Sequence, residues 1–306
     1  GPGNQIIGIK ECLILSKLLN RTCIVPPIRE HYLKSNVIYY NFNDIFKLNL
    51  SNIIIDDNKS SLINHIKIKS IYNFHPNYLN NKLKHEKLII DTGFNNKLLN
   101  KRCIKNNNDI NELQKIEDNI MVIKHLFNNV NISNCGINGC FKCELNKTYE
   151  YIYKDICSNW DYSDYIKQIG DNYINNKLKN ENYVSVHIRL PDIMYGDKID
   201  NFTKNDYNNN KLIEILKNIK HNCVFIASNN INYIKKLGIN INYLDINNKY
   251  GSFVEQYICC KSSQFNYLNL ENTRYTQIHN RSTWTSFVID YRKYLLKNNN
   301  NNNLRL

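Results

Sequence analysis

An arginine near the end of an apolar segment has the clearest chemistry in this chain. Arg189 follows His187 by two positions in the segment Tyr183–Leu190, which reads YVSVHIRL. A guanidinium presents a planar fork of N–H donors that fits phosphate oxygens. Arg189 could therefore bind a phosphorylated ligand. The alternative is an arginine at a strand end that only pairs with a surface carboxylate.

The segment that must position this pair is predicted to be a β-strand, because apolar and polar side chains alternate along it. His187 and Arg189 then project from the same face, about 7 Å apart. Pro191 cannot continue a hydrogen-bonded ladder, so the strand is expected to end there. Ligands of open α/β sheets bind just beyond such carboxyl ends. The opposite face is expected to carry Val184, Val186, Ile188 and Leu190.

Segments typical of strands and helices alternate after this strand, which predicts βαβ units and a parallel, Rossmann-type sheet. In order, they are strand Val184–Leu190, helix Asn210–Ile219, strand Cys223–Ser228, helix Ile231–Leu237, strand Ile241–Ile246 and helix Ser252–Lys261. A helix predicted over Tyr162–Leu178 is followed by a polar linker, Lys179–Asn182. We place a domain boundary at this linker, with domains over residues 1–179 and 180–297. The Asn-rich end, residues 298–306, is expected to be disordered.

The chain opens on Gly1-Pro2-Gly3-Asn4-Gln5, which is predicted to form a tight turn before a long apolar helix. A glycine turn that feeds a helix N-terminus lets backbone N–H groups approach a phosphate. The alternative is a plain helix start with Asn4 as its cap. A short buried strand, Thr22–Val25, is expected next, stopped by Pro26 and Pro27.

A last helix is predicted to begin behind Ser282, which is a good N-cap. The apolar stripe that supports this helix consists of Trp284, Phe287, Val288, Tyr291 and Leu295. Hydroxyl and N–H groups at the start of such a helix could bind phosphates. A capped C-terminal helix without a ligand explains the same residues.

Taken together, these motifs resemble the GDP-fucose protein O-fucosyltransferases. GPGNQ, the following SKLLNRTCIVPPI, the strand VSVHIRL and the turn RSTWTSF are similar to the family's opening, its H-x-R strand and its S-S-F-S-x-F turn. The resemblance implies an α/β fold of the GT-B type, with two Rossmann-like domains facing a cleft. It implies donor binding by Gly3, Asn4, His187, Arg189, Asn229, Ser282, Thr283 and Trp284, with Arg189 and Asn4 also catalytic.

The activity that the resemblance implies is transfer of fucose from GDP-fucose to a hydroxyl acceptor, on a protein Ser/Thr or a glycan, with inversion at the anomeric carbon. Arg189 would neutralise the charge that develops on the leaving GDP. No metal or other cofactor is expected, since no Asp-x-Asp pair lies near the motifs. No general base is evident, and Glu11 is expected on a helix surface. A transferase that uses another nucleotide sugar, and a non-catalytic nucleotide- or glycan-binding module, stay open as alternatives.

The composition excludes several classes of protein. With 306 residues, 42% of them hydrophobic, the chain can build two cores and is not disordered overall. The net charge of +13 comes from dispersed lysines rather than from a basic stripe interleaved with aromatics, so nucleic acid is not an expected partner. No apolar run is long enough for a transmembrane helix. A segment ahead of Gly1 is expected to be missing, and the resemblance implies the endoplasmic reticulum or Golgi lumen, with the cytoplasm as alternative.

The rest of the first half is less informative. A loop is expected over Asn41–Phe46, strands over Ile53–Ile55, Lys67–Ile71 and Leu88–Asp91, and a helix over Glu112–Phe127. The spacing of Cys135, Cys140 and Cys143, with Cys157 beyond them, is compatible with disulfides, a structural zinc site or buried thiols. The total of 10 cysteines is high for a cytosolic chain, which favours disulfides.

Overall fold

A computed structural model describes the chain in segments. These are residues 2–29, 39–55, 88–91, 111, 113–115, 120–123, 146–179, 182–190, 206–219, 223–239, 242–244, 249–270, 282–296 and 303–305. The chain forms two compact units, Gly1–Asp161 and Tyr162–Leu306. This division lies ahead of the Lys179–Asn182 linker, so the helix before the linker belongs to the second unit. The segment Lys67–Ile71 and Cys135, Cys140 and Cys143 lie outside the described residues.

The first unit is built on a parallel sheet in the order β5-β1-β6-β7. Its elements are α1 (Pro2–Leu19), β1 (Thr22–Val25), β2 (Ile28–Arg29), β3 (Tyr39–Tyr40), α2 (Phe42–Ile45), β4 (Phe46–Leu48), β5 (Ile53–Ile55), β6 (Leu88–Asp91), β7 (Ile120–Ile123), α6 (Asn146–Ser158) and β8 (Trp160–Tyr162). The predictions of β1, β5 and β6 are confirmed. Each consists mainly of β-branched or apolar residues, which parallel strands favour.

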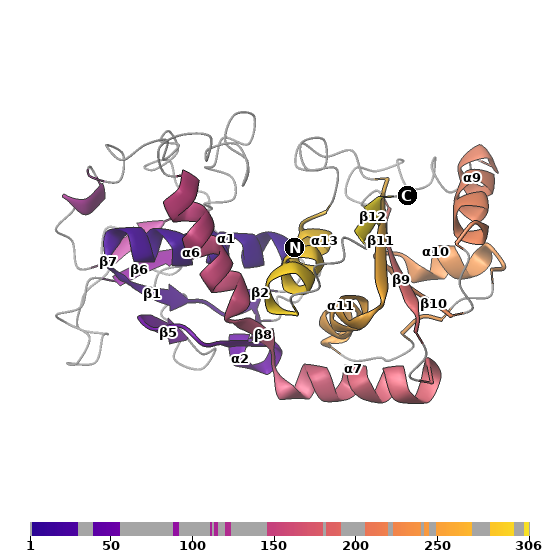
Figure 1. The fold of residues 1–306 in the computed structure, drawn as a ribbon, viewed down its shortest axis with the longest axis horizontal. Coiled ribbons are helices and arrows are strands. Elements are labelled where there is room, and N and C mark those ends of the chain that lie inside the picture. The colour runs from indigo at the N-terminus through magenta and orange to yellow at the C-terminus, as the bar shows by residue number, and fades with distance from the viewer. Residues whose placement is uncertain are drawn as a thin grey trace. The chain divides into compact units, whose positions relative to one another are not determined.

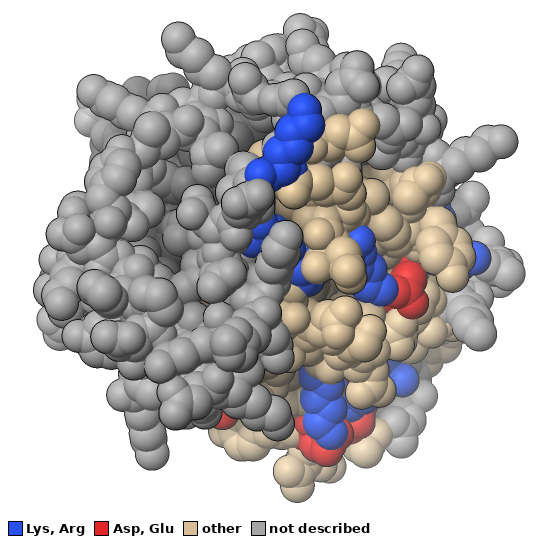
Figure 2. All heavy atoms as spheres, turned by 90° about the vertical axis from the view of Figure 1, so that its left-hand side faces the viewer, with Lys and Arg blue, Asp and Glu red and all other residues tan. Residues whose placement is uncertain are grey.

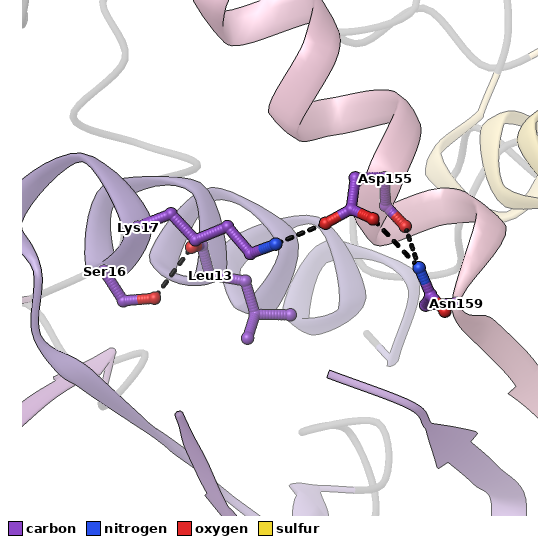
Figure 3. Close-up of polar contacts among 5 residues, drawn as sticks. All are labelled: Leu13, Ser16, Lys17, Asp155 and Asn159. Atoms are coloured by element: carbon purple, nitrogen blue, oxygen red, sulfur yellow. Dashed lines mark hydrogen bonds and ion pairs between the residues drawn. The ribbon is translucent and has the colours of Figure 1, made fainter. Parts of the chain in front are cut away.

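Helix α1 lies along the sheet of this unit beside α6 (Figure 1). Its residues are buried from Ile6 to Ser16, so it is a core helix rather than an amphipathic surface helix. At its exposed end, Lys17 forms an ion pair with Asp155 of α6 (Figure 3). Asn159 supports the carboxylate, because its Nδ2 donates to Asp155 Oδ1 at 3.0 Å. Partly exposed pairs of this kind add little stability, so burial holds the two helices together.

Three expectations for the first unit are wrong. The turn predicted over Gly1–Gln5 is helical from Pro2, because proline's missing N–H is not needed at a first helical position. The loop expected over Asn41–Phe46 holds α2 and the start of β4, since Phe42 and Phe46 pack edge-on against Trp160. The helix expected over Glu112–Phe127 is wrong in its second part: residues 113–114 are helical, but Ile120–Ile123 form strand β7, which pairs with β6.

The second unit has a parallel sheet in the order β10-β9-β11-β12. Its elements are α7 (Asp164–Lys177), β9 (Val184–Arg189), α9 (Asp206–Lys217), β10 (Val224–Ser228), α10 (Ile231–Lys236), α11 (Gly251–Lys261), β11 (Gln264–Asn269), α13 (Thr283–Asp290), the π-helical turn η5 (Tyr291–Leu295) and β12 (Asn303–Arg305). The predicted alternation is confirmed for β9, α9, β10, α10 and α11. The strand expected over Ile241–Ile246 is not formed as such: within the described part of that range the structure has one isolated bridge, from Asn242 to Phe225.

The end of the chain was predicted to be disordered, but part of it forms a strand. Asn303–Arg305 forms β12, which pairs in parallel with Phe265–Tyr267 of β11. An edge strand such as β11 exposes a row of backbone N–H and C=O groups that a short passing segment can pair with. The low-complexity composition of this end gives no sign of that pairing.

The two faces of β9 are covered by different helices (Figure 1). On one side, α9 and α10 cover an apolar cluster of Val186, Ile188, Leu190, Leu212, Leu216, Ile226, Tyr233, Ile234 and Leu268. On the other side, Tyr183 and Ser185 bond the backbone of α11 at Ile258 O and Cys259 O. The predicted alternation of β9 is therefore confirmed.

Helices α7 and α11 pack closely at Gly170. A Cβ at this position would lie 2.3 Å from the ring of Tyr257. The Tyr257 hydroxyl donates to Asp171 Oδ1 at 2.9 Å, which fixes the ring over the glycine. Glycine is therefore required where these two helices meet.

The described part of the surface is mixed in charge. Figure 2 shows one face on which Lys and Arg side chains are spread among uncharged residues, with Asp or Glu side chains beside some of them. This agrees with the dispersed lysines of the sequence. Among the described helices, none is both long and apolar enough to cross a bilayer.

Candidate functional site

The carboxyl end of β9 brings together several of the residues singled out in the sequence. His187 is 5% exposed, and its Nδ1 lies 2.7 Å from Thr285 Oγ1 of α13. Burial, followed by the nearby charge of Arg189, lowers the pKa of His187 to about 3. The imidazole is therefore neutral at physiological pH. It can position a ligand or the start of α13, but it does not supply positive charge.

Helix α13 begins directly after Ser282, as predicted, and its first turn lies beside this histidine. The Ser282 side chain accepts a hydrogen bond from Thr285 N at 3.1 Å, which confirms it as the N-cap. Ser282 Oγ also lies 3.1 Å from Thr285 Oγ1, so the Thr285 hydroxyl contacts both the cap residue and His187. A helix N-terminus has N–H groups without intrahelical partners and the positive end of the dipole, both of which suit an anion. Thr283 and Trp284, also in this first turn, are partly exposed.

Trp284 ties the start of α13 to two other elements. Its ring stacks on His187, with centroids 4.1 Å apart and an interplanar angle of 26°. Its Nε1 donates to Ser252 Oγ of α11 at 3.3 Å, and its carbonyl accepts from Gln256 Nε2 at 3.1 Å. Strand β9, helix α11 and helix α13 are thus locked together around one aromatic pair. Such rigid support keeps donor groups in place without reorganisation when a ligand binds.

Arg189 is the last residue of β9 and is half-buried. Because β9 alternates, its side chain projects from the same face as His187. Its effect on the pKa of His187 agrees with this placement. The structure therefore brings a permanent positive charge, a neutral imidazole and the start of α13 to one edge of the sheet. This is the arrangement that the sequence predicts for a phosphate group.

Asn229, predicted as a weaker donor-binding residue, lies at the same edge but makes bonds to the backbone. Its Oδ1 accepts from Leu190 N at 2.8 Å, and its Nδ2 donates to Leu190 O at 3.0 Å. The side chain thus holds the residue that follows Arg189.

Glu255 is a site candidate that the sequence analysis misses. In α11 it follows Ser252 by three residues and precedes Cys259 by four, so the three share one face of the helix. Ser252 accepts a hydrogen bond from Trp284, and the Cys259 carbonyl accepts one from Ser185 near the start of β9. Glu255 therefore lies along α11 between the helix turn that contacts Trp284 and the turn that contacts Ser185. Burial raises the pKa of its carboxyl to about 8. A carboxyl in such a place is a functional candidate on physical grounds.

A sequence signal for Glu255 does exist. It is an acidic residue in the mostly apolar run Phe253–Cys260, where an unpaired charge would be costly. In the structure Glu255 is partly buried, between the buried residues Val254 and Gln256. Gln256, beside it, is 1% exposed, and among the described residues its Oε1 has no hydrogen-bond partner. Ser252, Glu255, Gln256 and Thr285 thus complete the surroundings of the predicted residues.

The predicted residues of the chain start belong to the other unit. Gly3 and Asn4 lie in the first turn of α1, and their role in donor binding stays a prediction. Glu11, expected on a surface, is 8% exposed and accepts a hydrogen bond from the Tyr149 hydroxyl at 2.9 Å. Burial raises the pKa of Glu11 to about 7. The surface expectation fails because α1 is enclosed on nearly every side.

Metal ligands do not cluster in the residues that the structure describes: they hold no group of three or more His, Cys, Asp or Glu side chains placed to share an ion. Cys157, expected as a fourth cysteine of a disulfide or zinc cluster, is buried in α6. Its three proposed companions lie outside the described residues. The choice between disulfides and zinc stays a prediction.

Comparison with known proteins identifies the family. The model of the family "GDP-fucose protein O-fucosyltransferase" matches residues 1–295. No curated protein sequence matches the chain. Solved structures that are similar in fold include POFUT1 in complex with GDP, at 14% identity and a TM-score of 0.49, with 99% of this chain and 94% of that chain covered.

Fucosyltransferase NodZ from Bradyrhizobium is also similar, at 11% identity and a TM-score of 0.48, with 96% of this chain and 90% of that chain covered. NodZ α-1,6-fucosyltransferase soaked with GDP-fucose gives 12% identity and a TM-score of 0.49, with 95% and 89% covered. The assignment rests on the family model, which spans nearly the whole sequence. The chain belongs to the GDP-fucose protein O-fucosyltransferase family and is a glycosyltransferase.

Proposed function

We propose that this protein transfers fucose from GDP-fucose to a hydroxyl acceptor, with a protein Ser or Thr as the first candidate, and inverts the anomeric carbon. The observation that carries the proposal is the convergence of Arg189, His187 and the N-terminus of α13 at one edge of a parallel sheet. Open α/β sheets bind nucleotides at this edge.

The reaction that we propose breaks the bond between the anomeric carbon and the β-phosphate oxygen while the acceptor oxygen forms a new bond on the opposite face. Negative charge develops on the departing GDP. The Arg189 guanidinium and the N–H groups at the start of α13 would stabilise that charge. The acceptor proton must pass to a base, which the sequence does not identify.

Glu255 supports a guanine base in this proposal. Guanine offers N–H donors at N1 and at its exocyclic amine. The ionised carboxylate of Glu255 accepts such bonds, and they would offset the cost of burying its charge. Uracil has a single N–H and no amine, so it satisfies a carboxylate less well. We therefore propose that Glu255 contributes to selection of GDP over UDP.

We propose that positive charge comes from Arg189 rather than from a metal ion or other cofactor, with the nucleotide sugar as donor substrate. We further propose the GT-B arrangement of two Rossmann-like domains, in which the second domain binds the donor and the first domain is the acceptor side. Gly3 and Asn4 would then act from the first unit.

Differential stabilisation tests the donor. GDP and GDP-fucose should raise the melting temperature, and UDP-sugars should not. Transfer or hydrolysis of GDP-fucose should persist in EDTA. Glu255→Gln tests the recognition of the base separately, because it should reduce the preference for GDP over UDP while the Arg189 site stays intact. Equal stabilisation by UDP-sugars would remove the donor assignment, and activity that returns only with added Mn²⁺ would remove the metal-independent mechanism.

A further inference from the structure

Beyond the end of β9, the hydrogen bonding between β9 and β10 is continued by the side chain of Asn229 rather than by backbone groups of β10. The parallel ladder between β9 and β10 runs to the pair Ile188 and Ser228. After Ser228 the chain turns into α10, whose N-cap is Asn230. The Asn229 amide then takes the place of a peptide group, because its oxygen and nitrogen bond the N–H and C=O of Leu190 at 2.8 and 3.0 Å. Two bonds in this geometry allow the Leu190 peptide little rotation.

The same strand end is also held from its other side. Leu270 N, just beyond β11, donates to the carbonyl of Arg189 at 2.8 Å. The Leu190 side chain is 1% exposed in the apolar cluster under α9 and α10. These contacts fix the carbonyl of Arg189, both backbone groups of Leu190 and the Leu190 side chain. The Arg189 side chain must therefore project from the opposite face of the strand, toward His187.

We propose that Asn229 is a positioning residue for Arg189 and does not bind the donor itself. The amide sets the direction of the Arg189 side chain by pinning the next peptide, since a rotation there would swing the guanidinium away from the N-terminus of α13. An asparagine suits this task because it combines one acceptor and one donor. An aspartate would set a second oxygen against the Leu190 carbonyl. The catalytic part of this inference rests on the proposed function, whereas the backbone clamp does not.

Hydrogen exchange tests the clamp without any activity. The Leu190 amide should exchange at least about tenfold faster in Asn229→Ala, as expected for a lost buried hydrogen bond. Asn229→Asp should keep part of the protection, because it keeps the acceptor. Asn230→Ala is the matched control, since it removes the α10 cap at the next position but leaves Leu190 bonded. Unchanged exchange at Leu190 in Asn229→Ala would overturn the clamp.

Kinetics then test whether the clamp acts through Arg189. Asn229→Ala should lower kcat about ten- to a hundredfold, the range expected when a misplacement of about 1 Å disturbs a catalytic group. In an Arg189→Ala background the same change should have almost no further effect on kcat. The double variant with Asn229→Ala and Arg189→Ala should bind GDP with the same affinity as Arg189→Ala alone. An additional loss of GDP affinity there would show direct binding by Asn229 and overturn the proposal.

The two proposals fail in different ways. If the unmodified protein neither binds GDP nor turns over GDP-fucose, the proposed function is wrong, while exchange at Leu190 still decides the clamp. If the unmodified protein is active and the effects of Asn229→Ala and Arg189→Ala multiply in full, the positioning role is wrong and the proposed function stands.

Discussion

The two faces of β9 show how one strand serves two purposes. Toward α9 and α10 it presents Val186, Ile188 and Leu190, each at most 1% exposed. Toward α11 and α13 it presents Ser185 and His187, which are equally buried but hydrogen-bonded to those helices. The apolar face supplies burial energy without specific partners. The polar face uses directional bonds, and these place groups for chemistry. Variants on the two faces should therefore separate activity from stability.

The largest effect is expected on the polar face at Arg189. Removing one preorganised electrostatic donor costs about 10²–10³ in kcat. Arg189→Ala should show this loss of turnover with an almost unchanged melting temperature, because the residue lies beyond the apolar cluster. Arg189→Lys should recover little, since a lysine keeps the charge but loses the bidentate fork. Near-normal turnover of a folded Arg189→Ala protein would contradict the role assigned here.

A pH dependence of donor affinity is expected next, from Glu255. Its pKa rises from 4.5 to about 8 on folding because burial disfavours the charged form. Between these values the folded chain binds the extra proton, so its free energy of unfolding falls as pH rises and levels off above about pH 8. Guanine requires the carboxylate, so GDP affinity should increase over the same interval, by at most about tenfold per pH unit.

Calorimetric titration with GDP from about pH 6 to about pH 9 measures this effect. His187 of β9 and Cys259 of α11 are buried and should not titrate there: burial lowers the pKa of His187 to about 3 and raises that of the Cys259 thiol well above its usual range. In Glu255→Gln the affinity should be nearly independent of pH. A pH dependence that survives this substitution would assign the proton to another group.

Much of the polar face could be predicted from the sequence, because its signals are local. The alternation of β9 depends on a period of two, and the Ser282 cap on one side chain next to its own helix. Glu255 stands out in the sequence only as an acidic residue in a mostly apolar run, and that signal does not tell where its side chain lies. Helix α11 is buried on most sides, with Phe253, Val254, Tyr257 and Ile258 all at most 4% exposed. Periodicity therefore cannot tell which of its faces meets β9.

The first unit shows the same limit. β1 and β5 were predictable as short apolar runs, whereas α2 is only four residues long and depends on Phe42 and Phe46 packing against Trp160, far along the chain. Contacts at that sequence distance override local propensity. The two bonds of Asn229 could not be predicted for a related reason, since their partner Leu190 follows a neighbouring strand, far away in the sequence.

A smaller effect is expected at the helix cap of the site. Ser282→Ala removes the acceptor for Thr285 N and should cost about 1 kcal/mol of stability, as cap substitutions do. It should also weaken GDP binding, because the N–H groups at the start of α13 lose their fixed direction. Ser282→Asp restores a cap acceptor and should regain stability, but its charge should repel the phosphates. Equal GDP affinity in the unmodified protein, Ser282→Ala and Ser282→Asp would show that the start of α13 is not part of the donor site.

The smallest effect, and the one that isolates the apolar face, is expected from Ile188→Val. Ile188 is fully buried and precedes Arg189 directly, but its side chain points into the cluster under α9 and α10. Loss of one methylene should cost about 0.5–1.5 kcal/mol of stability. Turnover per folded molecule should stay the same, because valine keeps the β-branched shape and the backbone bonds at Arg189 and Leu190 are untouched. Thermal unfolding and initial rates on the same preparation measure both quantities. A loss of kcat comparable to that of Asn229→Ala would mean that packing on the apolar face aims Arg189 as much as the amide does, and the two faces of β9 would no longer be separable.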